Sequence, residues 1–172
     1  MRIWFVQLFS LLFFIGCHNT TETVGEPSLQ LIYANSFESH NDTVGWNGFG
    51  SWSIYKEAAP HGGLHSLSVK GIDVLPHATN ILQAPTENSL IIFRFWARCL
   101  VHGGVGNVEL ISLAPVESTL TAGSGVHETV WRPYSDTASF PAGYNLVIWI
   151  NGDAGLETPI LVDRIEILKI VK

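Results

Sequence analysis

Aromatic side chains close to arginine and asparagine are the groups in this sequence best suited to bind a ligand. Arg94 and Trp96 are two positions apart, as are Trp149 and Asn151, so each pair lies on one side of an extended strand. Sugar rings stack their C–H faces on aromatic planes, and guanidinium and amide groups hydrogen-bond to sugar hydroxyls. These residue types indicate carbohydrate binding. The candidate ligand-binding residues are Trp52, Arg94, Trp96, Arg98, Trp149 and Asn151.

The same residues have a structural interpretation that the sequence leaves open. Trp96 and Trp149 could pack against neighbouring side chains, and Arg94 and Arg98 could be solvated residues of a strand. Trp52 is three positions from Tyr55, so at most one of these two rings points into a shared cleft.

Little in the sequence supports catalysis. His61 and His65 flank a double glycine rather than share a helix face, and the seven histidines include no metalloprotease motif. Gly123-Ser124-Gly125 lacks the spacing of a nucleophile elbow. Glycoside hydrolysis needs two carboxylates at one cleft, and the acids of this chain cannot be paired from sequence. We expect a protein that is not an enzyme.

Short apolar segments separated by Gly, Pro, Asn and Asp run through the chain from Leu29 onward. No stretch longer than about ten residues has helical spacing without a glycine, a proline or a β-branched run. We therefore predict an all-β fold, a two-sheet antiparallel β-sandwich. The predicted strands span 30–33, 52–56, 66–71, 79–83, 90–100, 106–113, 127–134, 144–152 and 160–171.

Alternation within two of these segments predicts which side chains face the core. In 90–100 the inward set is Ile91, Phe93, Phe95 and Ala97, and in 144–152 it is Leu146, Ile148 and Ile150. If the two strands belong to one sheet, Arg94, Trp96, Trp149 and Asn151 could share its outer face.

The first 17 residues predict export. Arg2 supplies a positive start, and 3–15 is almost wholly apolar before Gly16 and Cys17. This ending resembles the lipobox of bacterial lipoproteins, in which the cysteine thiol receives a diacylglycerol and the preceding chain is removed. We predict a signal peptide over 1–17 and lipidation at Cys17. An ordinary signal peptide or a membrane anchor is the alternative, but a spanning helix needs roughly 20 apolar residues.

The remaining chain predicts a tether followed by one domain. Residues 18–28 are polar, without apolar periodicity, and indicate a flexible tether, while 29–172 suits a single domain with one core. His18 stands where an aspartate would favour the inner membrane, so the resemblance implies the outer membrane, reached through the lipid anchor only. The net charge of −6 argues against nucleic-acid binding. If Cys17 is lipidated, Cys99 has no disulfide partner within the chain and is expected to be buried.

Several short motifs occur in a recognisable order between about residues 32 and 168. They are Asn35-Ser36-Phe37-Glu38, Gly45-Trp46, the segment 62–69, Phe93-Arg94-Phe95-Trp96-Ala97-Arg98, the segment 131–134 and Leu161-Val162-Asp163-Arg164-Ile165. In this order they resemble the jelly-roll carbohydrate-binding modules of the family four and nine type, within the galactose-binding-like group. The resemblance implies a jelly-roll sandwich in which Trp46 and Trp131 pack structurally.

The resemblance also implies a structural Ca²⁺ where the first and last strands meet. In the family, a glutamate, an aspartate of the last strand and backbone carbonyls near a double glycine hold the ion, a set that suits a hard cation. The corresponding residues here are Ser36, Glu38, Gly63, Ser66 and Asp163. Arg164 replaces the second acid that usually follows the aspartate, which leaves one carboxylate fewer. Without an ion, Glu38 and Asp163 would be ordinary carboxylates at strand ends.

Two functions of different classes follow. The first is a non-catalytic lipoprotein that holds a polysaccharide or oligosaccharide at the cell envelope through aromatic side chains. The second is a structural or adhesive lipoprotein that binds another envelope protein through the same sandwich. Fold alone does not decide between them.

Overall fold

The computed structural model describes residues 27–48, 51–70, 77–113, 121–152 and 158–171. Within these residues the chain forms β-strands and one short 3₁₀ helix, with no α-helix, and no helix there is long and apolar enough to cross a membrane. The 3₁₀ helix spans His40–Thr43. The strands are β1 (Ser28–Asn35), β2 (Trp46–Asn47), β3 (Ser51–Tyr55), β4 (Ser66–Lys70), β5 (His77–Leu82), β6 (Ser89–Cys99), β7 (Gly106–Leu113), β8 (Thr121–Val126), β9 (Arg132–Phe140), β10 (Asn145–Asn151) and β11 (Pro159–Val171).

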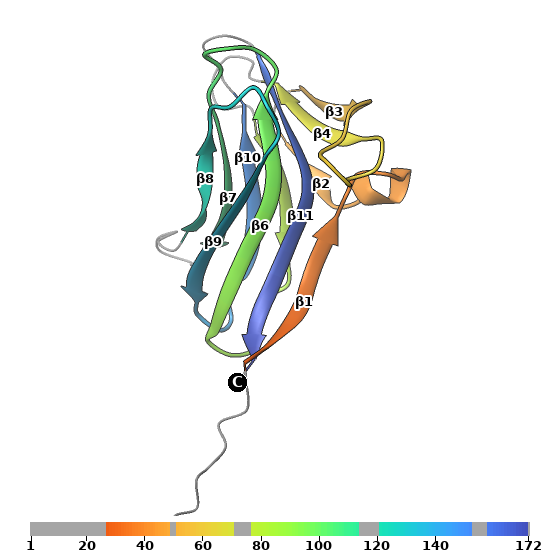
Figure 1. Ribbon diagram of the computed structural model, residues 1–172. Helices are drawn as coiled ribbons and strands as arrows, with labels where there is room; N and C mark the ends of the chain where they lie inside the picture. Colours follow the sequence, from red (N-terminus) through yellow and green to blue (C-terminus); the bar gives the residue numbers. More distant parts are fainter. Residues whose placement is uncertain (1–26, 49–50, 71–76, 114–120, 153–157, 172) are drawn as a thin grey trace, which may run out of the picture.

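The strands form two antiparallel sheets that pack face to face (Figure 1). One is a six-stranded sheet in the order β3-β4-β11-β6-β9, with β1 also paired to β11. The other is a five-stranded sheet in the order β2-β5-β10-β7-β8. The predicted two-sheet β-sandwich is therefore confirmed.

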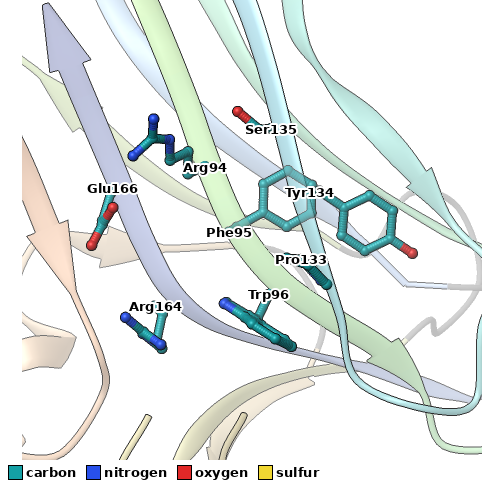
Figure 2. A pocket seen from close by; sticks show the side chains of 8 residues that line it. All are labelled: Arg94, Phe95, Trp96, Pro133, Tyr134, Ser135, Arg164 and Glu166. Atoms are coloured by element: carbon teal, nitrogen blue, oxygen red, sulfur yellow. The ribbon is translucent and has the colours of Figure 1, made fainter. Parts of the chain in front are cut away.

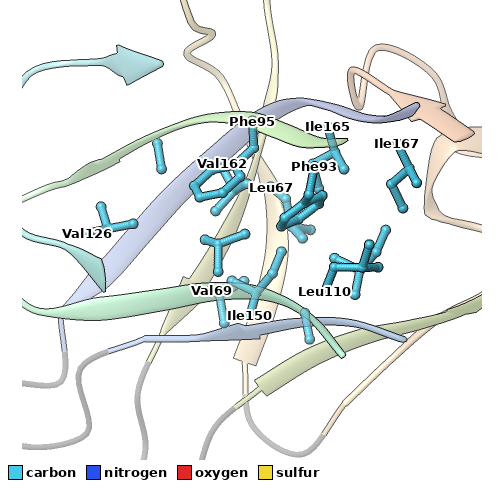
Figure 3. Packing of buried hydrophobic residues seen from close by; sticks show 14 of the residues in the cluster. Leu67, Val69, Phe93, Phe95, Leu110, Val126, Ile150, Val162, Ile165 and Ile167 are labelled. Atoms are coloured by element: carbon cyan, nitrogen blue, oxygen red, sulfur yellow. The ribbon is translucent and has the colours of Figure 1, made fainter. Parts of the chain in front are cut away.

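Apolar side chains of both sheets fill the space between them (Figure 3). Phe93 and Phe95 of β6 are buried, as are Ile148 and Ile150 of β10, which confirms the facing predicted from alternation. Cys99 is also fully buried, and its thiol donates to the carbonyl of Gly104 or Val126. A continuous apolar core holds the two sheets together by the hydrophobic effect.

Strand β11, the last strand of the domain, pairs with β1, the first. On one edge it pairs with β6 along most of its length. On its other edge it pairs first with β4, opposite residues 159–162, and then with β1, opposite residues 165–171. A β-bulge lies between Asp163 and Glu166, at the change of partner, and Arg164 there has a left-handed φ of 48°.

Most predicted strands agree with the structure; the two-residue strand β2 was not predicted, and two further regions differ. The prediction of a strand over 127–134 is wrong, because residues 127–131 connect β8 to β9 and the strand itself runs over Arg132–Phe140. β8 was missed altogether. Both are edge strands, and their small or polar residues give a weak apolar signal. β1 begins at Ser28, the last residue of the predicted tether, whose residues 18–26 lie outside the described part of the chain.

Candidate functional site

The two aromatic candidates lie in different sheets. β6, with Trp96, stands between β11 and β9, whereas β10, with Trp149, stands between β5 and β7. The expectation that Arg94, Trp96, Trp149 and Asn151 share one outer face is therefore wrong. Each pair holds together separately, because residues two apart on a strand face the same way. The molecule consequently has two candidate surfaces on opposite sides of the sandwich.

The first surface is the outer face of the five-stranded sheet. Trp149 and Asn151 point outward here, since the intervening Ile148 and Ile150 are buried in the core. The indole Nε1 of Trp149 donates a hydrogen bond of 2.8 Å to Asn151 Oδ1. This bond fixes the orientation of a half-buried aromatic ring on an outer face, as an aromatic binding platform requires.

Polar side chains of neighbouring strands surround Trp149. Thr79 of β5 and Glu109 of β7 are its two cross-strand partners, and Asn107 of β7 is opposite Asn151. Cross-strand neighbours on one face have Cβ atoms roughly 5 Å apart. Sequence analysis missed these three residues. Asn107 and Glu109 are polar positions between buried residues of β7, but only the strand order shows that all three residues adjoin Trp149.

One end of the same face is apolar. Val147 and Ile111 form a cross-strand pair two residues away from the Trp149 row, and both are buried although they lie outside the core cluster. Because both side chains are buried, they support the sheet at this end, and the accessible platform consists of the indole with the amide, hydroxyl and carboxylate groups around it. Such a surface suits a ligand with both C–H faces and hydroxyls.

The second surface is a hollow on the outer face of the six-stranded sheet (Figure 2). It has a volume of about 420 Å³ and is formed by β6, β9 and β11. Arg94 and Trp96 line it together, as their spacing predicts. Two residues that sequence analysis did not assign to ligand binding, Arg164 and Glu166, line it as well. The β-bulge in β11 brings them there, and a bulge is not visible in the sequence.

Two predicted ligand residues have structural roles. Trp52 packs against the core cluster from β3, so its ring faces inward. Arg98 donates to the carboxylate of Glu57 at 2.8 Å and to the carbonyl of Thr129 at 2.9 Å. These contacts use its guanidinium to join three segments of chain. These contacts give Trp52 and Arg98 structural roles, and their assignment to a ligand site stays a prediction.

Glu57 also holds the indole of Trp131, whose Nε1 donates to it at 3.0 Å. The Arg98 guanidinium lies 5.9 Å from the centre of the same ring. Trp46 is buried against Phe37, with ring centres 5.6 Å apart. Trp46 and Trp131 thus pack structurally, as the resemblance implied.

Glu38 and Asp163, the two carboxylates predicted to hold calcium, both approach the double glycine between β3 and β4. Glu38 Oε1 accepts the backbone N–H groups of Leu64 and His65 at 2.9 and 2.8 Å. A Cβ at Gly63 would lie 2.3 Å from Glu38 Cδ, and one at Gly62 would lie 2.1 Å from Asp163 Oδ2. Only glycines at both positions let the two carboxylates approach the turn from either side.

Asp163 is fully buried and accepts two backbone N–H groups. The donor to Oδ2 is Ala59, at 2.9 Å, and the donor to Oδ1 is Arg164, at 2.6 Å. Burial raises the pKa of Asp163 to about 6; the two N–H donors oppose this rise and the charge of Glu38 adds to it. Glu38 behaves oppositely: partial desolvation acts to raise its pKa, but the N–H donors of His65 and Leu64 hold it below its usual value.

Ser66 and Ser36, the remaining predicted ligands, lie in different surroundings. Ser66 Oγ is buried and has no hydrogen-bond partner among the described residues. Ser36 lines a small neighbouring hollow with Asp42 and Arg164. Within the described ranges, no three side chains of His, Cys, Asp or Glu are grouped so that they could share a metal ion. Any cation here would need hydroxyl and carbonyl oxygens in addition to the two carboxylates. Cys17 and the predicted signal peptide lie outside the described residues.

Comparison with known proteins identifies the fold. No protein-family model and no curated protein matches the chain. Among solved structures, a family 22 carbohydrate-binding module of Paenibacillus barcinonensis Xyn10C, a xylan-binding domain, superposes with a TM-score of 0.59 at 15% identity, over 83% of this chain and 96% of that one. The C-terminal family 22 module of Clostridium thermocellum Xyn10B gives 0.61 at 14% identity, over 81% and 92%. A family 16 carbohydrate-binding module gives 0.56 at 20% identity, over 73% and 91%.

At these identities the shared property is the fold. The matches confirm a sandwich of the type found in carbohydrate-binding modules, while the family four and nine type stays a prediction. One matched chain joins a family 22 module to a catalytic module, and this protein covers 28% of it.

The raised pKa of Asp163 predicts a pH-dependent stability in the presence of a chelator. Because the folded pKa, about 6, exceeds the usual 3.8, protonation favours the folded state, and this contribution is lost as the pH rises through about 6. Between pH 5 and 7.5 the melting temperature should fall by about 2–4 °C more in the native protein than in Asp163→Asn, which corresponds to ~1 kcal/mol in a domain of this size.

The measurement is thermal unfolding followed by circular dichroism at the two pH values. The two proteins differ in this one ionisable group, so the comparison removes the effect of all the others. Equal pH dependence in the two proteins would contradict the raised pKa.

Proposed function

We propose that this chain is a non-catalytic carbohydrate-binding domain that holds a polysaccharide or oligosaccharide on the outer face of its five-stranded sheet. The observation that carries the proposal is the Trp149 indole, fixed by Asn151 and flanked by Thr79 and Glu109. An oriented ring with hydrogen-bonding groups on both sides matches the alternating C–H and hydroxyl faces of a sugar. The likeness in fold to xylan-binding modules supports the same class of ligand.

The charge of this face favours a neutral sugar. Glu109 accepts hydrogen bonds from hydroxyls and repels an anionic ligand, while Asn107, Asn151 and Thr79 both donate and accept. Xylan, the ligand named for the Paenibacillus module, is a suitable first polysaccharide to test.

Replacing Trp149 by alanine should weaken retention on a neutral polysaccharide at least tenfold, corresponding to ~1.4 kcal/mol. The reason is the loss of the stacking plane. Affinity electrophoresis of the full chain in gels that contain xylan, cellulose derivatives or mannan measures this effect. Trp149→Phe should keep part of the retention, because a ring remains.

The matched control is Trp96→Ala, which removes a half-buried indole from the other sheet and should leave this retention unchanged. Melting temperatures separate binding from folding: a large fall for Trp149→Ala would mean that the ring is structural. If the intact protein is retained by no polysaccharide of a broad panel, the function is a different one, and binding of another envelope protein becomes the better hypothesis.

We also propose that Glu38 and Asp163 hold a structural Ca²⁺ at the β3–β4 turn, together with oxygens of Gly63, Ser66 and Ser36. The donor set fits: two carboxylates converge on one glycine turn, and the buried Ser66 hydroxyl lacks a hydrogen-bond partner among the described residues. Left-handed φ values at three non-glycine neighbours, Phe37, His61 and Arg164, support a local constraint at this place. The ion would neutralise the two carboxylates and join β11 to the turn.

Calcium should therefore raise the melting temperature of the protein. Free Ca²⁺ at 100 times its Kd stabilises a folded state by about 2.7 kcal/mol, and a chelator should remove this gain. Glu38→Gln should abolish the shift, whereas Glu128→Gln, at an exposed position remote from the turn in sequence, should keep it. A melting temperature indifferent to calcium in the native protein would refute the ion.

The cellular context is the third part of the proposal. We propose that the domain is attached to the cell envelope, at the outer membrane, by a lipid on Cys17, because residues 1–17 end as a lipobox does. Cys17→Ala should prevent incorporation of labelled palmitate and release the protein from the membrane fraction. Labelling that persists in the variant would show that Cys17 is not the lipidated residue.

A further inference from the structure

We propose that the hollow around Trp96 is a second binding site, which accepts a sugar ring carrying a carboxylate. It lies on the outer face of the six-stranded sheet, so it is separate from the Trp149 surface and goes beyond the function proposed above. Nothing in the proposal requires that the first site bind the same glycan.

Three strands build the walls of this hollow. Arg94 of β6 has Ser135 of β9 and Glu166 of β11 as its cross-strand partners, and Trp96 has Pro133 on β9. Figure 2 shows Arg94, Glu166 and Arg164 along one side, with Trp96 and Pro133 beside them. The indole of Trp96 next to the ring of Pro133 offers a flat apolar surface. The three charged side chains lie beside this surface. The hollow of about 420 Å³ lies within the size range of small-molecule sites.

The bulge in β11 is what directs Arg164 to this place. Its left-handed backbone, with φ of 48°, inserts an additional residue between Asp163 and Glu166. Arg164 Nη1 donates to the carbonyl of Pro60 at 3.2 Å, which holds the guanidinium at the rim. Only part of the donor capacity of this guanidinium is used by that bond, so further N–H groups remain for a ligand.

The charge of the hollow differs in sign from that of the whole protein. Arg94 and Arg164 outweigh Glu166 by one positive charge, whereas the chain has a net charge of −6. In the described part of the chain, neither Arg94 nor Glu166 belongs to an ion pair within 4.0 Å. Glu166 is the cross-strand partner of Arg94, but the two side chains do not form an ion pair, so the exposed guanidinium of Arg94 is available to a ligand anion.

These features together select the ligand class. Guanidinium groups form paired hydrogen bonds with carboxylates, and a single excess charge suits a monoanion. Glu166 and Ser135 can accept hydroxyl hydrogens, and Trp96 can stack on a ring. A hexuronic acid residue combines one carboxylate, several hydroxyls and a C–H face, so it satisfies all of these groups at once.

The probe is polygalacturonate, compared with the same polymer after its carboxyl groups have been reduced to alcohols. Affinity electrophoresis of the full chain should show retention by the acidic polymer that is at least tenfold stronger than by the reduced one. Arg94→Gln and Trp96→Ala should each weaken retention by the acidic polymer at least tenfold. Acetate at equal carboxylate concentration should not compete, which separates a sugar acid from a bare carboxylate.

Arg132→Gln is the matched control, because it removes one exposed arginine of β9 that does not line the hollow. It should retain the native affinity, as should Trp149→Ala, so failure of this site and failure of the Trp149 site are distinguishable. Equal retention of both polymers, no retention by the acidic polymer, or the same loss in Arg132→Gln as in Arg94→Gln would overturn the proposal. Since Arg94 is exposed, its substitution tests the site even if Trp96→Ala does not fold.

Discussion

The buried carboxylate of Asp163 is the group on which the arrangement of the six-stranded sheet depends. It lies at the point of β11 where β4 stops pairing and β1 starts. Its oxygens accept N–H groups from Ala59, in the β3–β4 loop, and from Arg164, in the bulge. A buried charged group left without such donors costs several kcal/mol. The loop and the bulge are therefore held in place together, and Glu57 of the same loop fixes Arg98 and Trp131 in turn.

The backbone around this carboxylate is strained in a localised way. Phe37, His61 and Arg164 have left-handed φ values, and each directly precedes or follows Glu38, Gly62 or Asp163. Such conformations cost of order 1–3 kcal/mol each and persist only where surrounding contacts determine them. Burial of Phe37 beside Trp46 and the N–H bonds to both carboxylates supply those contacts. The proposed Ca²⁺ would stabilise this arrangement further, because it would remove the repulsion between the carboxylates of Glu38 and Asp163.

The two outer faces of the sandwich differ in chemistry because their central strands differ. β10 contributes Trp149 and Asn151 to a face on which the neighbours of the indole are an acid and neutral polar residues. β6 contributes Trp96 and Arg94 to a hollow whose excess charge is positive. Each indole lies beside a polar residue two positions away on its own strand, and that residue is the neutral Asn151 on β10 but the positively charged Arg94 on β6. A sandwich can in this way present two distinct ligand surfaces around one apolar core.

The alternation in 90–100 and 144–152 was enough to predict the buried sets that include Phe93 and Ile148, because side chains of a strand alternate with a period of two. The prediction failed for β8 and β9, since edge strands of small and polar residues carry little periodic signal. The alternation of apolar and polar residues also does not show which strands are neighbours in a sheet. Pairing between segments far apart in the chain placed Trp96 and Trp149 in different sheets. The same kind of pairing produced the bulge that brings Arg164 beside Trp96, and it brought Asp163 to the double glycine. The sequence by itself determined the sandwich and its core, and tertiary pairing decided how the candidate residues divide into sites.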